Sequence, residues 1–195
     1  MAISLGYLAL HLSLNRVGRV LPFLLFLLAA TFQSSILILL PFFLFPAFLT
    51  RFDWRIFFAV TILPAAFLYP FADYLSYLNP LVLNALNSIA AISANPFSIL
   101  NILLIFILLN GISSAKQLPL NKLPWLYLSA MGLGLWYGFM SIPIFSHRLL
   151  ELTIFSYFFW LPYLPRKRRI FGMSLFLILA TYMFGRAIFI DRLFS

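Results

Sequence analysis

An arginine and a glutamate stand three residues apart in a chain that is otherwise nearly free of charge. Arg148 and Glu151 belong to the tract 145–152, which lies between two strongly apolar segments, and His147 precedes the arginine. On one continuous helix, Arg148 and Glu151 would be neighbours at i, i+3, and His147 would face Glu151 at i, i+4. A charge in or near a lipid bilayer is costly unless it is paired or hydrated. The tract is therefore the first candidate site.

The chemistry of this tract suits a phosphate. A guanidinium held by a carboxylate keeps free donors, and its planar fork matches phosphate oxygens. At a membrane surface, Arg148 can hold the pyrophosphate head group of a lipid whose tail stays in the bilayer. Glu151 or His147 would orient the arginine or act as a general base. In the simpler alternative, Arg148 only extends to lipid head groups and pairs with Glu151.

The composition indicates the kind of protein that carries the tract. The chain has 195 residues, of which 64% are hydrophobic and 9% charged, and its mean hydropathy is +1.06. A soluble domain of this size cannot bury so much apolar surface. Several apolar stretches approach the roughly 17–25 residues that a helix needs to cross the hydrocarbon layer. They are continuous rather than alternating, which favours helices over a barrel. We expect an all-α, polytopic integral membrane helical bundle that forms one domain over residues 1–195.

The bundle is expected to have about five full spans after a short N-terminal helix at 2–14. The apolar runs place the spans at 56–72, 97–112, 123–144, 149–164 and 170–190. On the helix at 123–144, the series Ala130, Gly134 and Gly138 predicts close helix packing.

Residues 20–49 form an apolar stretch that is too long for one straight helix and too short for two full spans. It is interrupted by Gln33-Ser34-Ser35 and then by Pro41 and Pro46. A re-entrant pair of half-depth helices that meet at a polar turn fits this pattern, and so does a single tilted and kinked helix.

Residues 73–95 are rich in amides and tyrosines, and we expect a periplasmic loop that carries a short amphipathic helix. Asn84 and Asn87 are suited to hydrogen-bond sugar hydroxyls, and Tyr77 to stack on sugar rings. In the alternative, these side chains bind no sugar and only hydrate the loop.

The basic residues predict the orientation. If residues 20–49 enter and leave on one side, ten of the thirteen basic residues share a side, which the positive-inside rule makes cytoplasmic. The basic loop at 165–169 lies on that side, and Arg148 and Glu151 lie toward the opposite, periplasmic face. The net charge of +9 then reflects membrane topology, and no nucleic-acid partner is expected.

Several classes of site are excluded by what the sequence lacks. There are no cysteines, and the two histidines are far apart without an acidic cluster, so no metal site is predicted. The chain has no Gly-rich phosphate loop and no nucleophile elbow. We expect neither a metal nor a cofactor.

Two tracts resemble the EpsG/Wzy-type polysaccharide polymerases. Residues 28–41 read LAATFQSSILILLP and are similar to a family signature in which a small-residue apolar run leads to Phe-His-x-Ser and another apolar segment. Residues 144–151 read IFSHRLLE and resemble the late arginine-containing motif of the family. The order and spacing of the tracts also fit, and Gln33 stands where the family usually has histidine.

The resemblance implies an enzyme of the bacterial inner membrane that joins undecaprenyl-pyrophosphate-linked oligosaccharide repeat units on the periplasmic side. It implies that Arg148 contacts the pyrophosphate, that Glu151 supports it, and that Gln33, Ser34 and Ser35 bind donor or acceptor. Because it covers only the C-terminal half of the family, it also implies a truncated or split form. A second hypothesis is a non-catalytic membrane component, a carrier or assembly subunit that works with other glycan-assembly proteins.

Overall fold

The computed structural model describes residues 2–15, 20–32, 34–44, 51–78, 97–140, 142, 146, 149–150 and 154–189. All regular elements in these ranges are helical. In chain order they are α1 (Ala2–Leu14), α2 (Val20–Phe32), the 3₁₀ helix η1 (Ser34–Leu39), α3 (Leu40–Leu44), α4 (Trp54–Leu78), α6 (Ile99–Ile112), the 3₁₀ helices η3 (Ala115–Gln117) and η4 (Leu120–Lys122), α7 (Leu123–Gly138), α9 (Tyr157–Trp160), the 3₁₀ helix η5 (Leu161–Tyr163) and α10 (Arg166–Phe189).

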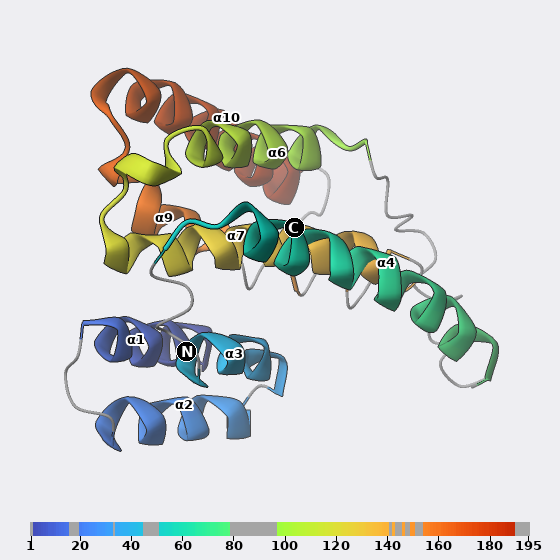
Figure 1. Ribbon diagram of the computed structural model, residues 1–195. Helices are drawn as coiled ribbons and strands as arrows, with labels where there is room; N and C mark the ends of the chain where they lie inside the picture. Colours follow the sequence, from blue (N-terminus) through green and yellow to red (C-terminus); the bar gives the residue numbers. More distant parts are fainter. Residues whose placement is uncertain are drawn as a thin grey trace.

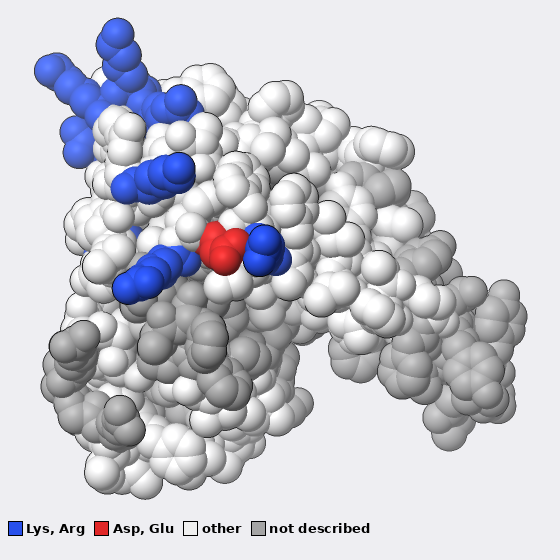
Figure 2. All heavy atoms as spheres, in the orientation of Figure 1, with Lys and Arg blue, Asp and Glu red and all other residues white. Residues whose placement is uncertain are grey.

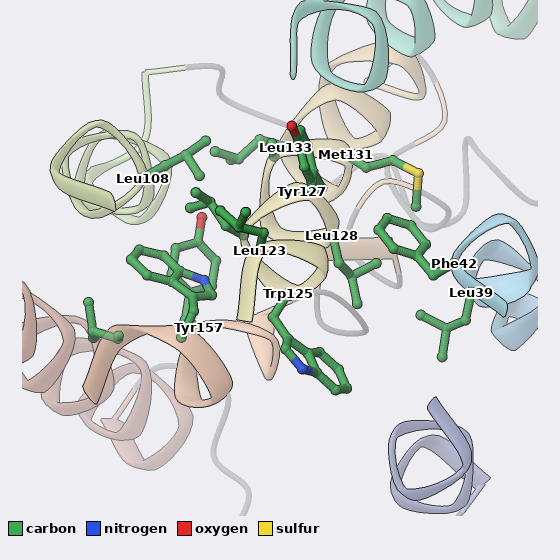
Figure 3. Packing of buried hydrophobic residues seen from close by; sticks show 14 of the residues in the cluster. Leu39, Phe42, Leu108, Leu123, Trp125, Tyr127, Leu128, Met131, Leu133 and Tyr157 are labelled. Atoms are coloured by element: carbon green, nitrogen blue, oxygen red, sulfur yellow. The ribbon is translucent and has the colours of Figure 1, made fainter. Parts of the chain in front are cut away.

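Helix α7 is the central element. It is apolar on all sides, and nearly all of its residues are buried, as expected of a helix inside a bundle. In Figure 1, α4 runs along it, α6 and α10 lie on one side, and α1–α3 lie on the other. Figure 3 shows side chains from these neighbours pointing toward α7, among them Leu108 of α6, Phe42 of α3 and Leu39 of η1.

The closest helix contact joins α7 to α4. A Cβ on Gly134 would collide with the carbonyl oxygen of Thr61, and one on Gly138 would lie 2.5 Å from the carbonyl oxygen of Pro64. Ala130, one turn before Gly134, is fully buried. Small residues at these positions let the two backbones approach closely, which is how apolar helices gain packing energy in a membrane. This is the packing role that the small-residue series predicts.

Residues 20–44 fold into a helical hairpin. Helix α2 ends at Phe32, η1 begins at Ser34, and α3 returns along α2 so that the rings of Phe26 and Phe43 lie 4.7 Å apart. A single straight or gently kinked helix would separate these two rings by about 25 Å. The pair therefore has the folded-back form of the first alternative, and α1 packs across both of its arms.

Two expected loop boundaries are wrong. The basic run at 166–169, expected as a loop, forms the first turn of α10, where the amide of Arg169 donates to the carbonyl of Pro165 at 2.8 Å. Proline is tolerated just before a helix begins, and arginine and lysine are good helix formers. Helix α4 continues past residue 72 to Leu78, so the first part of the expected loop at 73–95 is helical.

Two of the expected spans are also shorter than predicted. Helix α7 ends at Gly138 rather than at 144. A helix that reached 144 would contain Pro143, and a proline disfavours helix at the residue before it. The described part of 149–164 forms short helical pieces, α9 and η5, rather than one long helix. Pro162 and Pro165 interrupt this segment, because proline has no amide hydrogen to continue the ladder.

One helix of the described residues is long and apolar enough to cross a membrane. It is α10, over Arg166–Gly185, and only 11% of its most apolar stretch is buried inside the protein. Shorter apolar helices cover Leu5–Leu14, Val20–Phe32, Trp54–Leu68 and Ile99–Ile112. The all-helical class is confirmed for the described residues, with one helix of full span length among them.

The contact between α4 and α7 can be tested with two glycines of different surroundings. Replacing Gly134 by alanine forces its new methyl group against the backbone of α4, which cannot rotate away as a side chain would. We expect Gly134→Ala to lower the free energy of unfolding by about 1–3 kcal/mol, the usual cost of overpacking. The measurement is the thermal unfolding midpoint of the protein in detergent.

Gly185 is the matched control, because a Cβ there meets nothing within 4 Å. Gly185→Ala should be neutral, or stabilising by up to about 1 kcal/mol through helix propensity. Equal midpoints for the two variants would contradict the close approach of α4 and α7.

Candidate functional site

The residues predicted to carry chemistry fall largely outside the described part of the chain. Six of them lie outside it: Gln33, Asn84, Asn87, His147, Arg148 and Glu151. The other three lie in helices, Ser34 and Ser35 at the start of η1 and Tyr77 near the end of α4, but the description of these residues does not extend to their side chains. The structure therefore places none of the predicted side chains relative to another.

Residues of the arginine tract on both sides of Arg148 are described, and they are held in the protein. Ser146 is fully buried, and its amide donates to the carbonyl of Ile142 at 3.1 Å. On the other side, Leu150 is buried in the hydrophobic core. The tract is thus anchored on both sides of Arg148.

The basic residues whose side chains are described gather at one end of the bundle. They come from three places: the start of α4, the connection between α6 and α7, and the start of α10 (Figure 1). Figure 2 shows Lys and Arg side chains on one side of the molecule with acidic atoms among them. Asp53, between Arg51 and Arg55, is the acidic residue whose side chain is described there. The cationic end consists of Arg51, Arg55, Lys116, Lys122, Arg166, Lys167, Arg168 and Arg169.

Specific polar contacts fix the segments of this cationic end. The Tyr127 hydroxyl of α7 accepts from the amide of Asp53 at 2.9 Å and donates to the carbonyl of Arg51 at 3.0 Å. The Asn110 side-chain amide of α6 donates to the carbonyl of Arg168 at 2.8 Å, and the Arg168 guanidinium donates to the Ser113 hydroxyl. These bonds tie the starts of α4 and α10 to α7 and α6.

An apolar groove lies between α4, α6 and α7. It has a volume of about 320 Å³, within the range of pockets that hold small ligands. Its lining includes Phe57 and Ala65 of α4, Leu109 of α6 and Gly134 of α7. The one threonine in the lining, Thr61, uses its hydroxyl to donate to the carbonyl of Phe57 at 2.8 Å, so it offers the groove no free donor. The groove is therefore chemically suited to a hydrocarbon chain.

A hydroxyl cluster joins α7 to α9 inside the core. The Ser129 and Ser156 hydroxyl oxygens lie 2.5 Å apart, and the indole nitrogen of Trp160 donates to Ser129 at 2.9 Å. Ser129 also donates to the carbonyl of Trp125 at 3.0 Å. All of these side chains are almost completely buried, so the cluster holds helices together and is not open to a substrate.

An aromatic cluster attaches α1 to the rest of the bundle. The rings of Trp125 and Phe159 stack with their centroids 4.1 Å apart, and Tyr7 of α1 stacks on both at 5.4 and 5.6 Å. His11, one turn further along α1, lies 5.8 Å from Phe159, and its Nε2 is 3.0 Å from the side-chain nitrogen of Asn15. These contacts give His11 a packing role.

Sequence reasoning missed the polar residues that matter in this part of the structure. In the sequence, Tyr127 and Ser129 are ordinary members of an apolar run, and Lys122 is one of the basic residues that indicate the membrane orientation. The sequence signal for Lys122 was weak: it stands two residues before Pro124, the proline that marks the start of α7. Their partners are far away in the sequence, which no local pattern reveals.

The hydroxyl cluster makes a test of how α7 and α9 are held. Ser129→Ala leaves the buried indole N–H of Trp160 without its acceptor, so we expect a loss of about 1–3 kcal/mol in the free energy of unfolding. Ser174→Ala on the exposed side of α10 is the control and should change stability by less than about 0.5 kcal/mol. Chemical or thermal unfolding in detergent measures both, and equal stability of the two variants would contradict the role of the cluster.

Comparison of the chain with protein-family models, with curated proteins and with solved structures gives no match.

Proposed function

We propose that this protein is a multi-pass protein of the bacterial inner (cytoplasmic) membrane. The observation that carries this proposal is the apolar character of the outer helix faces. Phe23 and Leu27 of α2, Phe67 of α4, Phe106 of α6 and Leu177 of α10 are all exposed. A protein dissolved in water rarely leaves contiguous apolar patches on so many helices, whereas lipid tails cover them at no cost.

The gathered cations support an orientation for this membrane protein. Lysine and arginine are enriched on the cytoplasmic side, so the cationic end is the proposed cytoplasmic end. Helix α7 begins at this end and runs away from it to Gly138, before the arginine tract begins. This direction supports a periplasmic position for Arg148 and its neighbours.

We further propose that the protein polymerises oligosaccharide repeat units carried on undecaprenyl pyrophosphate, at the periplasmic face. In this reaction a hydroxyl group of one oligosaccharide attacks the anomeric carbon of another, and the bond to the lipid pyrophosphate breaks. Arg148 would stabilise the negative charge that develops on the leaving pyrophosphate, a preorganised electrostatic role. Glu151 would hold the guanidinium, and His147 or Glu151 would take the proton of the attacking hydroxyl.

The groove between α4, α6 and α7 is the proposed position of the isoprenoid tail. It is apolar, it opens on a face that exposes Ile62 and Leu109, and it runs along the half of α7 that leads to the arginine tract. The groups proposed to bind the sugars are Gln33, Ser34, Ser35, Tyr77, Asn84 and Asn87, and other membrane proteins of glycan assembly are the proposed partners.

The groove can be tested with neighbouring alanines on α4. Ala65 lines it, whereas Ala66 is exposed on the outside of the helix. We expect Ala65→Trp to fill the groove and to reduce, by about tenfold or more, the amount of a polyprenyl-pyrophosphate that stays bound to the purified protein in native mass spectrometry, since a displaced chain loses its buried apolar surface. Ala66→Trp should retain the lipid, and equal retention by both variants would contradict the assignment of the groove.

The catalytic assignment is tested in cells whose long-chain polysaccharide depends on this protein. Arg148→Ala and Arg148→Lys should both reduce long-chain polymer by about a hundredfold or more, because a lysine cannot reproduce the bidentate contact. Arg55→Lys at the cationic end is the matched control and should leave the polymer unchanged. The readout is the chain-length distribution on a gel, together with the amount of each variant in the membrane.

Two outcomes would decide against a polymerase. Unchanged chain length in both Arg148 variants would reject the catalytic role of this residue. Polymer of normal length in an altered amount at the cell surface would instead indicate the non-catalytic carrier or assembly subunit.

A further inference from the structure

Lys122 is a cation that the fold buries almost completely. Its side chain is 7% exposed, and its ammonium lies 4.3 Å from the centroid of the Tyr163 ring. In the part of the chain that the structure describes, it forms no salt bridge. A buried charge is costly unless an opposite charge accompanies it, and a cation–π contact offsets only part of that cost. The position therefore favours an anion beside Lys122.

The surroundings of Lys122 add further positive potential. Lys122 is the N-cap of α7, a 16-residue helix whose first turn contains no acidic residue. The amide groups at a helix N-terminus attract anions. The Arg169 guanidinium donates at 3.4 Å to the carbonyl of Pro162, the residue before Tyr163, so both cations contact η5.

Exposed apolar side chains lie next to both cations. Leu120, two residues before Lys122, is 64% exposed, and Ile170, directly after Arg169, is 59% exposed. The Tyr163 ring is also half exposed, as is typical of aromatic residues at the level of lipid head groups. A ligand that fits this site needs a phosphate for the cations and hydrocarbon for the neighbouring side chains.

We propose that Lys122, Tyr163 and Arg169 form a binding site for the phosphate of an anionic phospholipid in the leaflet at the cationic end. The lipid phosphate accompanies the Lys122 ammonium and accepts hydrogen bonds from Arg169, while its acyl chains cover Leu120 and Ile170. This site is separate from the proposed polymerase site at the other end of α7. It requires the membrane position of the protein but not its polymerase activity.

The experiment uses the full chain, purified in detergent and mixed with phosphatidylglycerol, phosphatidylcholine or inorganic phosphate. We expect phosphatidylglycerol to remain bound in native mass spectrometry and to raise the thermal unfolding midpoint, whereas phosphatidylcholine and inorganic phosphate do neither. Lys122→Met removes the charge and keeps the length of the side chain, and it should reduce phosphatidylglycerol binding by about fivefold or more. Lys116→Met is the matched control, since Lys116 is exposed on the same connection, and it should bind like the unchanged protein.

Two further variants keep the test decisive if Lys122→Met does not fold. Lys122→Arg retains the charge and the ring contact and should bind phosphatidylglycerol, and Arg169→Gln alters only an exposed side chain and should weaken binding. The proposal is overturned if Arg169→Gln binds as the unchanged protein does, or if Lys116→Met weakens binding as much as Lys122→Met, which would indicate general surface charge. It is also overturned if inorganic phosphate stabilises the protein as well as the lipid does, or if no anionic lipid is retained.

Discussion

The close approach of the α4 and α7 backbones is the contact on which the rest of the structure depends. Gly134 and Gly138 present no side chain to the carbonyl groups of Thr61 and Pro64, and any larger residue would separate the two helices. Apolar helices gain little from the hydrophobic effect when lipid surrounds them, so dense packing and buried polar bonds must hold them together. This contact positions α7 at the centre, where α6 and α9 also pack on it.

Different kinds of bond attach the other elements to α7. Aromatic stacking on Trp125 attaches α1, hydrogen bonds to Ser129 attach α9, and the Tyr127 hydroxyl attaches the segment before α4. A buried polar group in such a core contributes most when all of its partners are present. The groove exists because α4 and α6 both pack on α7 while the surface between them stays open, so its shape follows from the same central helix.

The two ends of α7 have contrasting chemistry. Its start lies among the eight basic residues of the cationic end with Asp53 beside them, and its end leads to the arginine tract, in which Ser146 is buried. A lipid-linked substrate and a structural phospholipid both carry phosphate on a hydrocarbon chain. The proposed polymerase site and the proposed phospholipid site thus use the same chemistry at opposite ends of one helix.

The sequence by itself determined the all-helical class, the packing role of Gly134 and Gly138, and the gathering of the described basic residues at one end, because composition, small-residue spacing and charge are local properties of the chain. It misjudged the start of α10 and the segment around α9, where prolines and arginines act through helix propensity and tertiary contacts together. Only the tertiary structure decided that residues 20–44 fold back on themselves, that Ser129 accepts from Trp160, and that Lys122 is buried on Tyr163. The physical reason is that burial and pairing depend on residues that are distant in the chain, and the cost of a charge or hydroxyl is set by its neighbours in space.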